Sequence, residues 1–354
     1  MSPTDNSNRF VPYVDIYFHI YFIAGITFQS ILLFLIFKKS PAYLHDFKIF
    51  LCNTTLFQIL NIFCAYFIQY RALPNSTTLA ILSRGPCMRF GAEACFANYH
   101  IFVVYTSTDM ITDNLIQGIS SSVAMSISAT IVFRYFLLKN WKPLRRLFFF
   151  MILFSHLPPA IATIIPFLSE WNFSIVRKQT YSEHPSYDLS IYEPFPGFAD
   201  IQSLSFLTVT TMIAIGAYCV PLVSIFIIHQ IWNITNIHSH LSQHTKNQTT
   251  TLLKGLAIQV LFPILSYIPI ITVYIYSQVS HQEVLFVEHL LNIMTCFPSL
   301  VDPFVSFYFI IPYRIAILQY LHIYKPPPIH RNHLTTLHPS VVGDIRKSSI
   351  IVMT

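Results

Sequence analysis

Long apolar stretches, each about as long as a membrane-spanning helix, recur along the chain. The clearest runs from Ile116 to Leu138, 23 residues with a single charge, Arg134, near the end. A helix rises about 1.5 Å per residue, so this stretch spans a hydrocarbon core of roughly 30 Å. Glycine, serine and alanine recur along it, as in helices that pack closely against neighbours inside a membrane bundle. We therefore predict a central membrane helix.

Six further apolar segments follow the same pattern, and polar or proline-rich connections separate them. The predicted fold is an all-α membrane protein, a seven-transmembrane helix bundle in residues 14–323. Residues 1–13 precede the bundle, the segment after Pro312 is expected along the membrane surface, and 324–354 form a predicted disordered tail. The predicted spans are 14–37, 47–69, 116–138, 147–167, 204–232, 254–277 and 287–311.

Composition excludes a soluble globular domain. Hydrophobic residues make up 54% of the chain and charged residues only 10%, against about 25% charged in soluble domains. The surrounding partner is therefore membrane lipid, and the net charge of +6 gives no reason to expect a nucleic-acid partner. No basic region precedes an early apolar run, so we predict no cleavable signal peptide.

The distribution of positive charge predicts the orientation. With an extracellular N-terminus, 15 of the 21 lysines and arginines fall on the cytoplasmic side, as the positive-inside rule requires. Two sequons, at Asn75 and Asn172, then lie in outer loops and are predicted glycosylation sites. The six positive residues on the outer side are Arg9, Arg71, Arg84, Arg89, Arg177 and Lys178.

One region is too long for the pattern. Arg134 follows Cys95 by 39 positions, and residues 103–117 have the character of neither a loop nor a complete helix. The segment begins with a valine, whose codons start with GT, and ends with a glutamine, one of whose codons is CAG. A spliced intron starts with GT and ends with AG. We interpret 103–117 as a retained intron in the gene model. The alternative is an extended third helix with a polar turn, and a peptide detected within 105–115 would establish it.

The cysteine pattern leaves one pair on the predicted outer side. The connection 168–203 contains no cysteine, so Cys87 and Cys95 are the candidates for a disulfide in an oxidising compartment. Two free thiols are the alternative.

Several short motifs together resemble those of one family. They are Gly85-Pro86-Cys87 followed by Phe90-Gly91 and Cys95-Phe96, Arg134-Tyr135, Asp302-Pro303, and Pro312-Tyr313-Arg314. This combination resembles the nematode serpentine chemoreceptors of class delta, a branch of the seven-transmembrane G-protein-coupled receptors, over residues 14–323. The resemblance implies a plasma-membrane receptor of ciliated sensory neurons, with a small-molecule ligand, a heterotrimeric G protein on the cytoplasmic face, and no cofactor.

Two of these motifs are candidate signalling switches. Arg134-Tyr135 resembles the end of the Asp-Arg-Tyr motif, with Phe133 in place of the acid. The alternative for Arg134 is an anchor that reaches the lipid phosphates. Asp302-Pro303 resembles the Asn-Pro-x-x-Tyr block, and a carboxylate inside a membrane is costly enough to indicate function. The alternative for Asp302 is a hydrogen bond to Asn53 or to a serine of the central helix.

The ligand is expected in the outer half of the bundle, under the 168–203 connection. Its mostly aromatic and apolar surroundings favour a small, largely apolar molecule. His100, Glu288 and His289 are the candidate polar contacts. Prolines within the spans would act as hinges, since each removes a backbone hydrogen bond.

Other function classes are disfavoured. His240 and His244 have the spacing of one histidine box of membrane di-iron oxygenases, but such a site needs further boxes and the sequence has none. A small-molecule transporter is the alternative function, although seven predicted spans with unlike halves argue against the paired repeats typical of transporters. A retinal receptor is excluded because residues 287–311 contain no lysine.

Overall fold

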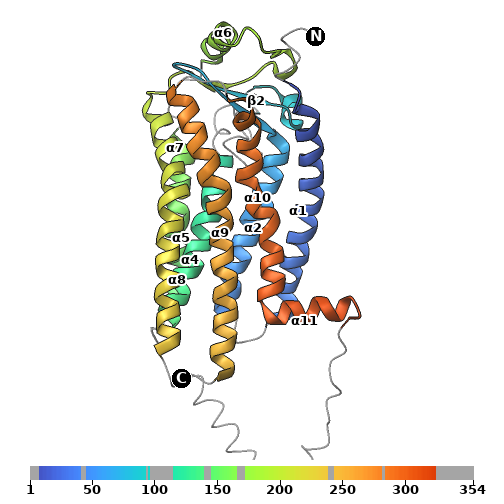
Figure 1. Cartoon of the computed structure of the whole chain (residues 1–354), viewed down its shortest axis with the longest axis vertical. Helices are drawn as coiled ribbons and strands as arrows, with labels where there is room; N and C mark the ends of the chain where they lie inside the picture. The colour runs from blue at the N-terminus through green and yellow to red at the C-terminus, as the bar shows by residue number, and fades with distance from the viewer. Residues whose placement is uncertain are drawn as a thin grey trace, which may run out of the picture. The chain divides into compact units, whose positions relative to one another are not determined.

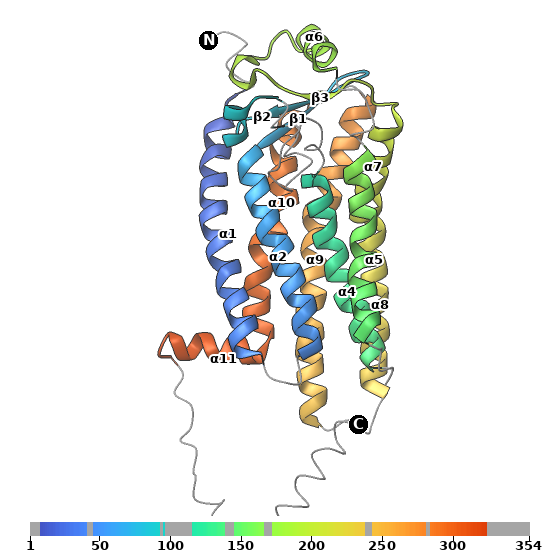
Figure 2. The same cartoon turned by 180° about the vertical axis from the view of Figure 1, so that it is seen from behind.

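The computed structural model describes residues 8–40, 45–92, 95, 115–138, 145–165, 172–237, 243–280 and 284–323. Long helices run side by side through the first of two compact units, residues 1–314 (Figures 1 and 2). They are α1 (Val11–Lys39), α2 (His45–Ile68), α4 (Leu115–Leu138), α5 (Arg145–Ile164), α7 (Leu204–Ala214) continuing into α8 (Val220–Ile237), α9 (Gln243–Ser280) and α10 (Leu285–Phe309).

The membrane character of these helices follows from their length and composition. Five helical segments are long and apolar enough to cross a membrane, and shorter apolar segments lie within α4 and α5. The predicted helical membrane bundle is confirmed at this level. Seven spans and an extracellular N-terminus stay predictions. The five segments are Val11–Lys39, Phe47–Ile68, Leu204–Ile234, Thr250–Ser280 and Leu285–Phe309.

Helix α4 has the central position that its small residues predict. It packs against α2, α5, α7, α8 and α9, and Ser126 and Thr130 on it are buried. Its apolar residues Ile127 and Ile131 share a core cluster with Ile231 of α8 and with residues of α9. Small and hydroxyl side chains let these helices approach closely while the apolar residues fill the remaining space.

The predicted span 204–232 contains Pro221, and its helix continues through a π-helical turn, Ile215–Cys219, just before that proline. The backbone N–H of Val220 donates to the carbonyl of Ile215, five residues back. Pro221 has no backbone N–H, so the helix loses a normal hydrogen bond there, and the wider turn lies immediately before that gap.

A folded cap covers the end of the bundle where α2 ends and α10 begins (Figures 1 and 2). The sequence predicts a polar connection at 70–96 and a long loop at 168–203, but the described residues of both segments include regular secondary structure. Strands β1 (Tyr70–Pro74), β2 (Leu79–Ser83) and β3 (Gly197–Phe198) form an antiparallel sheet in that order, and α6 (Phe173–Glu183) lies in the same cap. Two 3-10 turns complete it, η3 (Pro86–Phe90) and η5 (Ser190–Tyr192).

The β1–β2 hairpin is buried on both faces, and for this reason the sequence pattern did not predict it. Tyr70 and Ile81 pack into the core cluster shared with the bundle helices. Ala80 and Leu82 point the other way, into a cluster with residues of α6 and the connection that follows it. A strand buried on both faces is apolar throughout and lacks the alternation that marks a half-exposed strand.

Several predictions fall outside the described residues. These are the part of the suspected intron at 103–114, the ligand candidate His100, His240 and the tail 324–354. Residues 115–117 begin α4, and the intron interpretation stays a prediction. A final helix, α11 (Ile311–Tyr320), follows α10.

Candidate functional site

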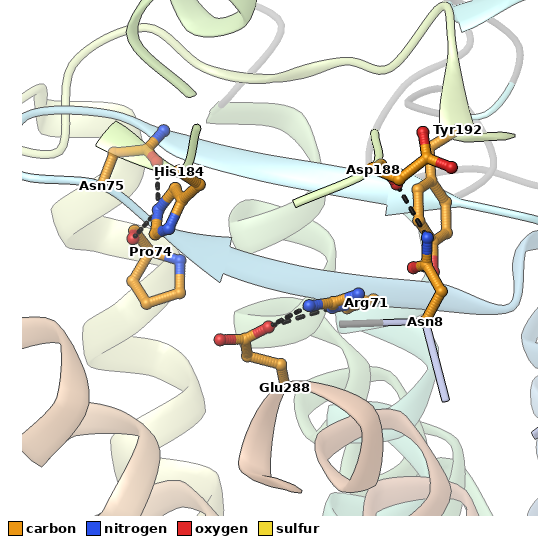
Figure 3. Close-up of polar contacts among 8 residues, drawn as sticks. All are labelled: Asn8, Arg71, Pro74, Asn75, His184, Asp188, Tyr192 and Glu288. Carbon is orange, nitrogen blue, oxygen red and sulfur yellow. Dashed lines mark hydrogen bonds and ion pairs between the residues drawn. The ribbon is translucent and has the colours of Figure 1, made fainter. Parts of the chain in front are cut away.

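A buried ion pair joins the cap to the bundle. Arg71 lies on β1 and Glu288 in the first turn of α10. The Nε and Nη2 atoms of Arg71 donate to Oε2 of Glu288 at 2.9 and 2.7 Å (Figure 3). Both side chains are almost completely buried, 4% and 3% exposed. Charges this deep are stable only when paired, so this contact fixes β1 against the start of α10.

Aromatic residues of the 184–203 connection surround the arginine. The guanidinium lies 5.1 Å from the ring centroid of Tyr187, a cation–π contact. Burial alone would lower the pKa of Arg71, but the carboxylate of Glu288 and the hydroxyl of Tyr192 outweigh it and raise the pKa. Arg71 therefore stays charged.

A small hollow, here called the outer pocket, lies beside this ion pair. Its polar lining residues include Asp15, Gln69, Arg71, Arg84, Tyr192 and His289, and Val11 and Val14 are among its apolar ones. Its free volume is about 20 Å³, close to the room for one water molecule. Of the predicted ligand contacts, His289 lines the pocket, whereas Glu288 is engaged by Arg71.

The chain reaches this pocket through a tight turn after α2. Gln69 has a left-handed backbone, φ 48°, and the N–H groups of Arg84 and Gly85 both donate to the carbonyl of Ile68. A Cβ at Gly85 would overlap the carbonyl oxygen of Phe67, so only glycine fits there. This explains the glycine of the Gly85-Pro86-Cys87 motif physically.

The two candidate cysteines follow this turn. Cys87 and Cys95 form a disulfide with Cα atoms 5.0 Å apart. Both are buried in the core cluster under the sheet.

Polar contacts also lock the tip of the β1–β2 hairpin to α6. The Nδ2 of Asn75 donates to the hydroxyls of Thr78 and Thr180 at 2.7 and 2.9 Å. The ring of His184 contacts Oδ1 of Asn75 at 3.1 Å (Figure 3). Elsewhere in the cap, Asn8 donates to the carbonyl of Asp188. These contacts tie together segments far apart in the sequence.

This arrangement argues against our prediction of a glycan on Asn75. The residue is only 2% exposed, and a glycan on Nδ2 would replace one of the two hydrogens that this nitrogen donates to Thr78 and Thr180. At the other sequon, Asn172 is exposed and uses its Oδ1 to cap α6 by accepting from the N–H of Ile175. Its nitrogen is the atom that would carry a glycan.

A second polar cluster lies deeper in the bundle, around Asp302 of α10. One carboxyl oxygen accepts from Nε2 of Gln58 on α2 at 2.7 Å, and the other accepts from Nε2 of Gln259 on α9. Gln29 of α1 extends this series of hydrogen bonds by donating to Oε1 of Gln58 and to the carbonyl of Ser299. We call these residues the inner network. Within the described part of the chain, no cationic side chain contacts Asp302.

The partners of Asp302 that we considered from the sequence are wrong. Asn53 bonds instead to Ser126 of α4 and to His156 of α5. The spacing of glutamines along α2 and α9 gave no signal, since glutamine is common in helices, and only the packing brings Gln58 and Gln259 together. Pro303, the other half of the motif, is buried next to Asp302.

The second predicted switch lies at the end of α4. Arg134 and Tyr135 lie near the C-terminal end of this helix, and the ring of Tyr135 packs against the cluster shared with α8 and α9. Phe133, in the position of the usual acid, is fully buried and stacks on Phe50 of α2 with ring centroids 4.7 Å apart. The aromatic substitution thus joins α4 to α2.

These observations define a class, a helical membrane protein with a folded cap at one end and a polar network between its helices. The chain belongs to the Srd family of serpentine chemoreceptors, because the family model "Serpentine type 7TM GPCR chemoreceptor Srd" matches residues 14–319.

Individual relatives agree with this membership. The chain is 40% identical to serpentine receptor class delta-59 of Caenorhabditis elegans over 316 residues, 89% of this chain and 93% of that protein. It is 30% identical to serpentine receptor class delta-51 of the same organism over 333 residues, covering 93% and 94%. The resemblance inferred from the motifs is confirmed, and the family is one of receptors, not of enzymes.

Proposed function

We propose that this chemoreceptor binds a small molecule at its capped end and signals to a heterotrimeric G protein at the opposite end. The capped end is then extracellular and the C-terminus cytoplasmic, with the protein in the plasma membrane of sensory cilia. The positive-charge bias of the sequence supports this orientation. Family membership supports both the ligand class and the G protein.

One observation carries the proposed mechanism: polar contacts tie α2 and α10 together at two depths. Glu288 holds Arg71, which follows α2 closely in the chain, and Asp302 holds Gln58 of α2 itself. Glu288 and Asp302 are 14 residues apart, which is about 20 Å along a helix. A ligand that shifts the start of α10 therefore acts on the residue that also holds α9 through Gln259. This is a route for a population shift between two arrangements of the bundle.

A reporter assay with Arg134→Ala tests the signalling end. A calcium or cAMP reporter identifies an activating compound from a panel of odorants and small metabolites. At matched surface expression, Arg134→Ala is expected to abolish the response while ligand binding persists. Arg134→Lys should recover part of it, because lysine keeps the charge but lacks the planar five-donor group. Arg145→Ala controls for loss of positive charge. If Arg134→Ala signals like the wild type, the residue is an interfacial anchor.

Glycopeptide mass spectrometry tests the orientation. Expressed in eukaryotic cells, the protein is expected to carry a glycan on Asn172 and none on Asn75, which the cap buries. A tag before Val11 should stain intact cells, and one at the C-terminus only permeabilised cells. A glycan on Asn233 or Asn247 would reverse the proposed orientation.

A further inference from the structure

The outer pocket brings together charged groups from distant segments of the chain. Asp15 comes from α1, Arg71 from β1 and Arg84 from the turn before η3, while His289 comes from α10. The charges of both guanidinium groups, of Arg71 and Arg84, influence the pKa of the Tyr192 hydroxyl. Burial raises the pKa of this tyrosine above its ordinary value, and the charges of Arg71 and Arg84 reduce that increase.

The two arginines differ in how firmly they are held. Arg71 is 4% exposed and donates twice to Glu288, and breaking such a buried pair is strongly unfavourable. Arg84 is 39% exposed, and its ion pair with Asp15, itself 30% exposed, is a single contact of 3.2 Å. Exposed single-contact pairs contribute little. Arg84 is therefore the arginine whose ion pair a ligand can replace.

The size of the pocket decides how a ligand enters. A free volume of about 20 Å³ is close to the room for one water molecule. An anionic group gains space when the Asp15 side chain leaves Arg84, because it then occupies the volume of the departing carboxylate. Asp15 is part-exposed, so it becomes hydrated when displaced.

We propose that the outer pocket binds the carboxylate of a small organic acid, which replaces Asp15 on Arg84. The guanidinium presents a planar set of donors that matches both oxygens of a carboxylate. Tyr192 and His289 lie beside the same space, and Val11 and Val14 offer an apolar surface for the body of the acid. A cationic ligand would instead approach Asp15 against the charges of Arg71 and Arg84. This inference rests on the proposed ligand end of the receptor and refines its ligand class.

Thermal unfolding of the full-length receptor in detergent tests this proposal with defined probes. Butyrate and butyramide have the same apolar body and differ in charge. A ligand that binds only the folded state raises the unfolding temperature as its concentration rises. Butyrate is expected to raise it and butyramide is not. Arg84→Gln should abolish the shift, and Arg89→Gln, which removes an exposed arginine outside the pocket, should leave it unchanged.

The Asp15→Asn variant supplies an independent result. Removing the competing carboxylate should tighten butyrate binding about fivefold, the scale of an exposed ion pair, and this variant retains all the arginine donors. Equal shifts with acid and amide, no shift with butyrate, or a butyrate shift that survives Arg84→Gln would each overturn the proposal. Stabilisation by butylamine that Asp15→Asn abolishes would do so as well. Butyrate binding with a silent reporter would instead count against G-protein signalling alone.

Discussion

Arg71→Ala is expected to destabilise the receptor by about 3–5 kcal/mol, because it leaves the carboxylate of Glu288 buried without its counter-charge. The pair is 4% and 3% exposed, so the carboxylate stays shielded from bulk water when the arginine is removed. Glu288→Ala should have an effect of similar size, because it leaves the guanidinium of Arg71 buried without its counter-charge. The measurement is thermal unfolding of the purified receptor together with the fraction that reaches the cell surface.

Two further variants separate loss of an ion pair from loss of packing. Arg71→Met combined with Glu288→Leu replaces both charges by apolar groups of similar length and should recover most of the stability. Arg84→Ala removes the half-exposed arginine of the neighbouring pair and should cost no more than about 1 kcal/mol. If Arg71→Ala proves as stable as Arg84→Ala, the buried pair does not hold the cap to α10.

The bundle was predictable from the sequence because its signal is local. The length of each apolar stretch directly predicts the length of its helix. The predicted span 287–311 differs from α10, Leu285–Phe309, by two residues at each end. The first residues of α9 are polar and carry no apolar signal, so the helix begins at Gln243, well before the predicted start at Lys254.

The cap and the polar contacts were not predictable, because they depend on residues far apart in the chain. The Arg71–Glu288 pair spans 217 positions and Gln58–Asp302 spans 244. Glu288 was predicted as a ligand contact because it is a polar residue in the part of the predicted bundle where the ligand was expected. Nothing local to it indicates that an arginine on a buried strand already occupies it.

Asp302→Asn is expected to keep the receptor folded and to raise its basal signalling. Gln29 donates to the carbonyl of Ser299 and to Oε1 of Gln58, which fixes the amide of Gln58 with its nitrogen toward residue 302. The new amide nitrogen must therefore face Gln259, whose side chain can rotate to present its oxygen. Both contacts survive, but each loses the strength that a charged acceptor gives. The hold of α10 on α9 weakens, and this favours the signalling arrangement.

Asp302→Leu provides the contrast. It removes both acceptors and leaves the buried amide of Gln58 and the part-buried amide of Gln259 without this partner. The cost is about 1–3 kcal/mol for the buried amide, so the unfolding temperature should fall clearly below that of Asp302→Asn. Gln259→Leu should also raise basal signalling. Combined with Asp302→Asn it should add less than the sum of the two, because both changes weaken one contact. Basal signalling of Asp302→Asn equal to that of the wild type, at matched surface expression, would show that Asp302 only satisfies its neighbours. The charge would then have no part in switching between the two arrangements.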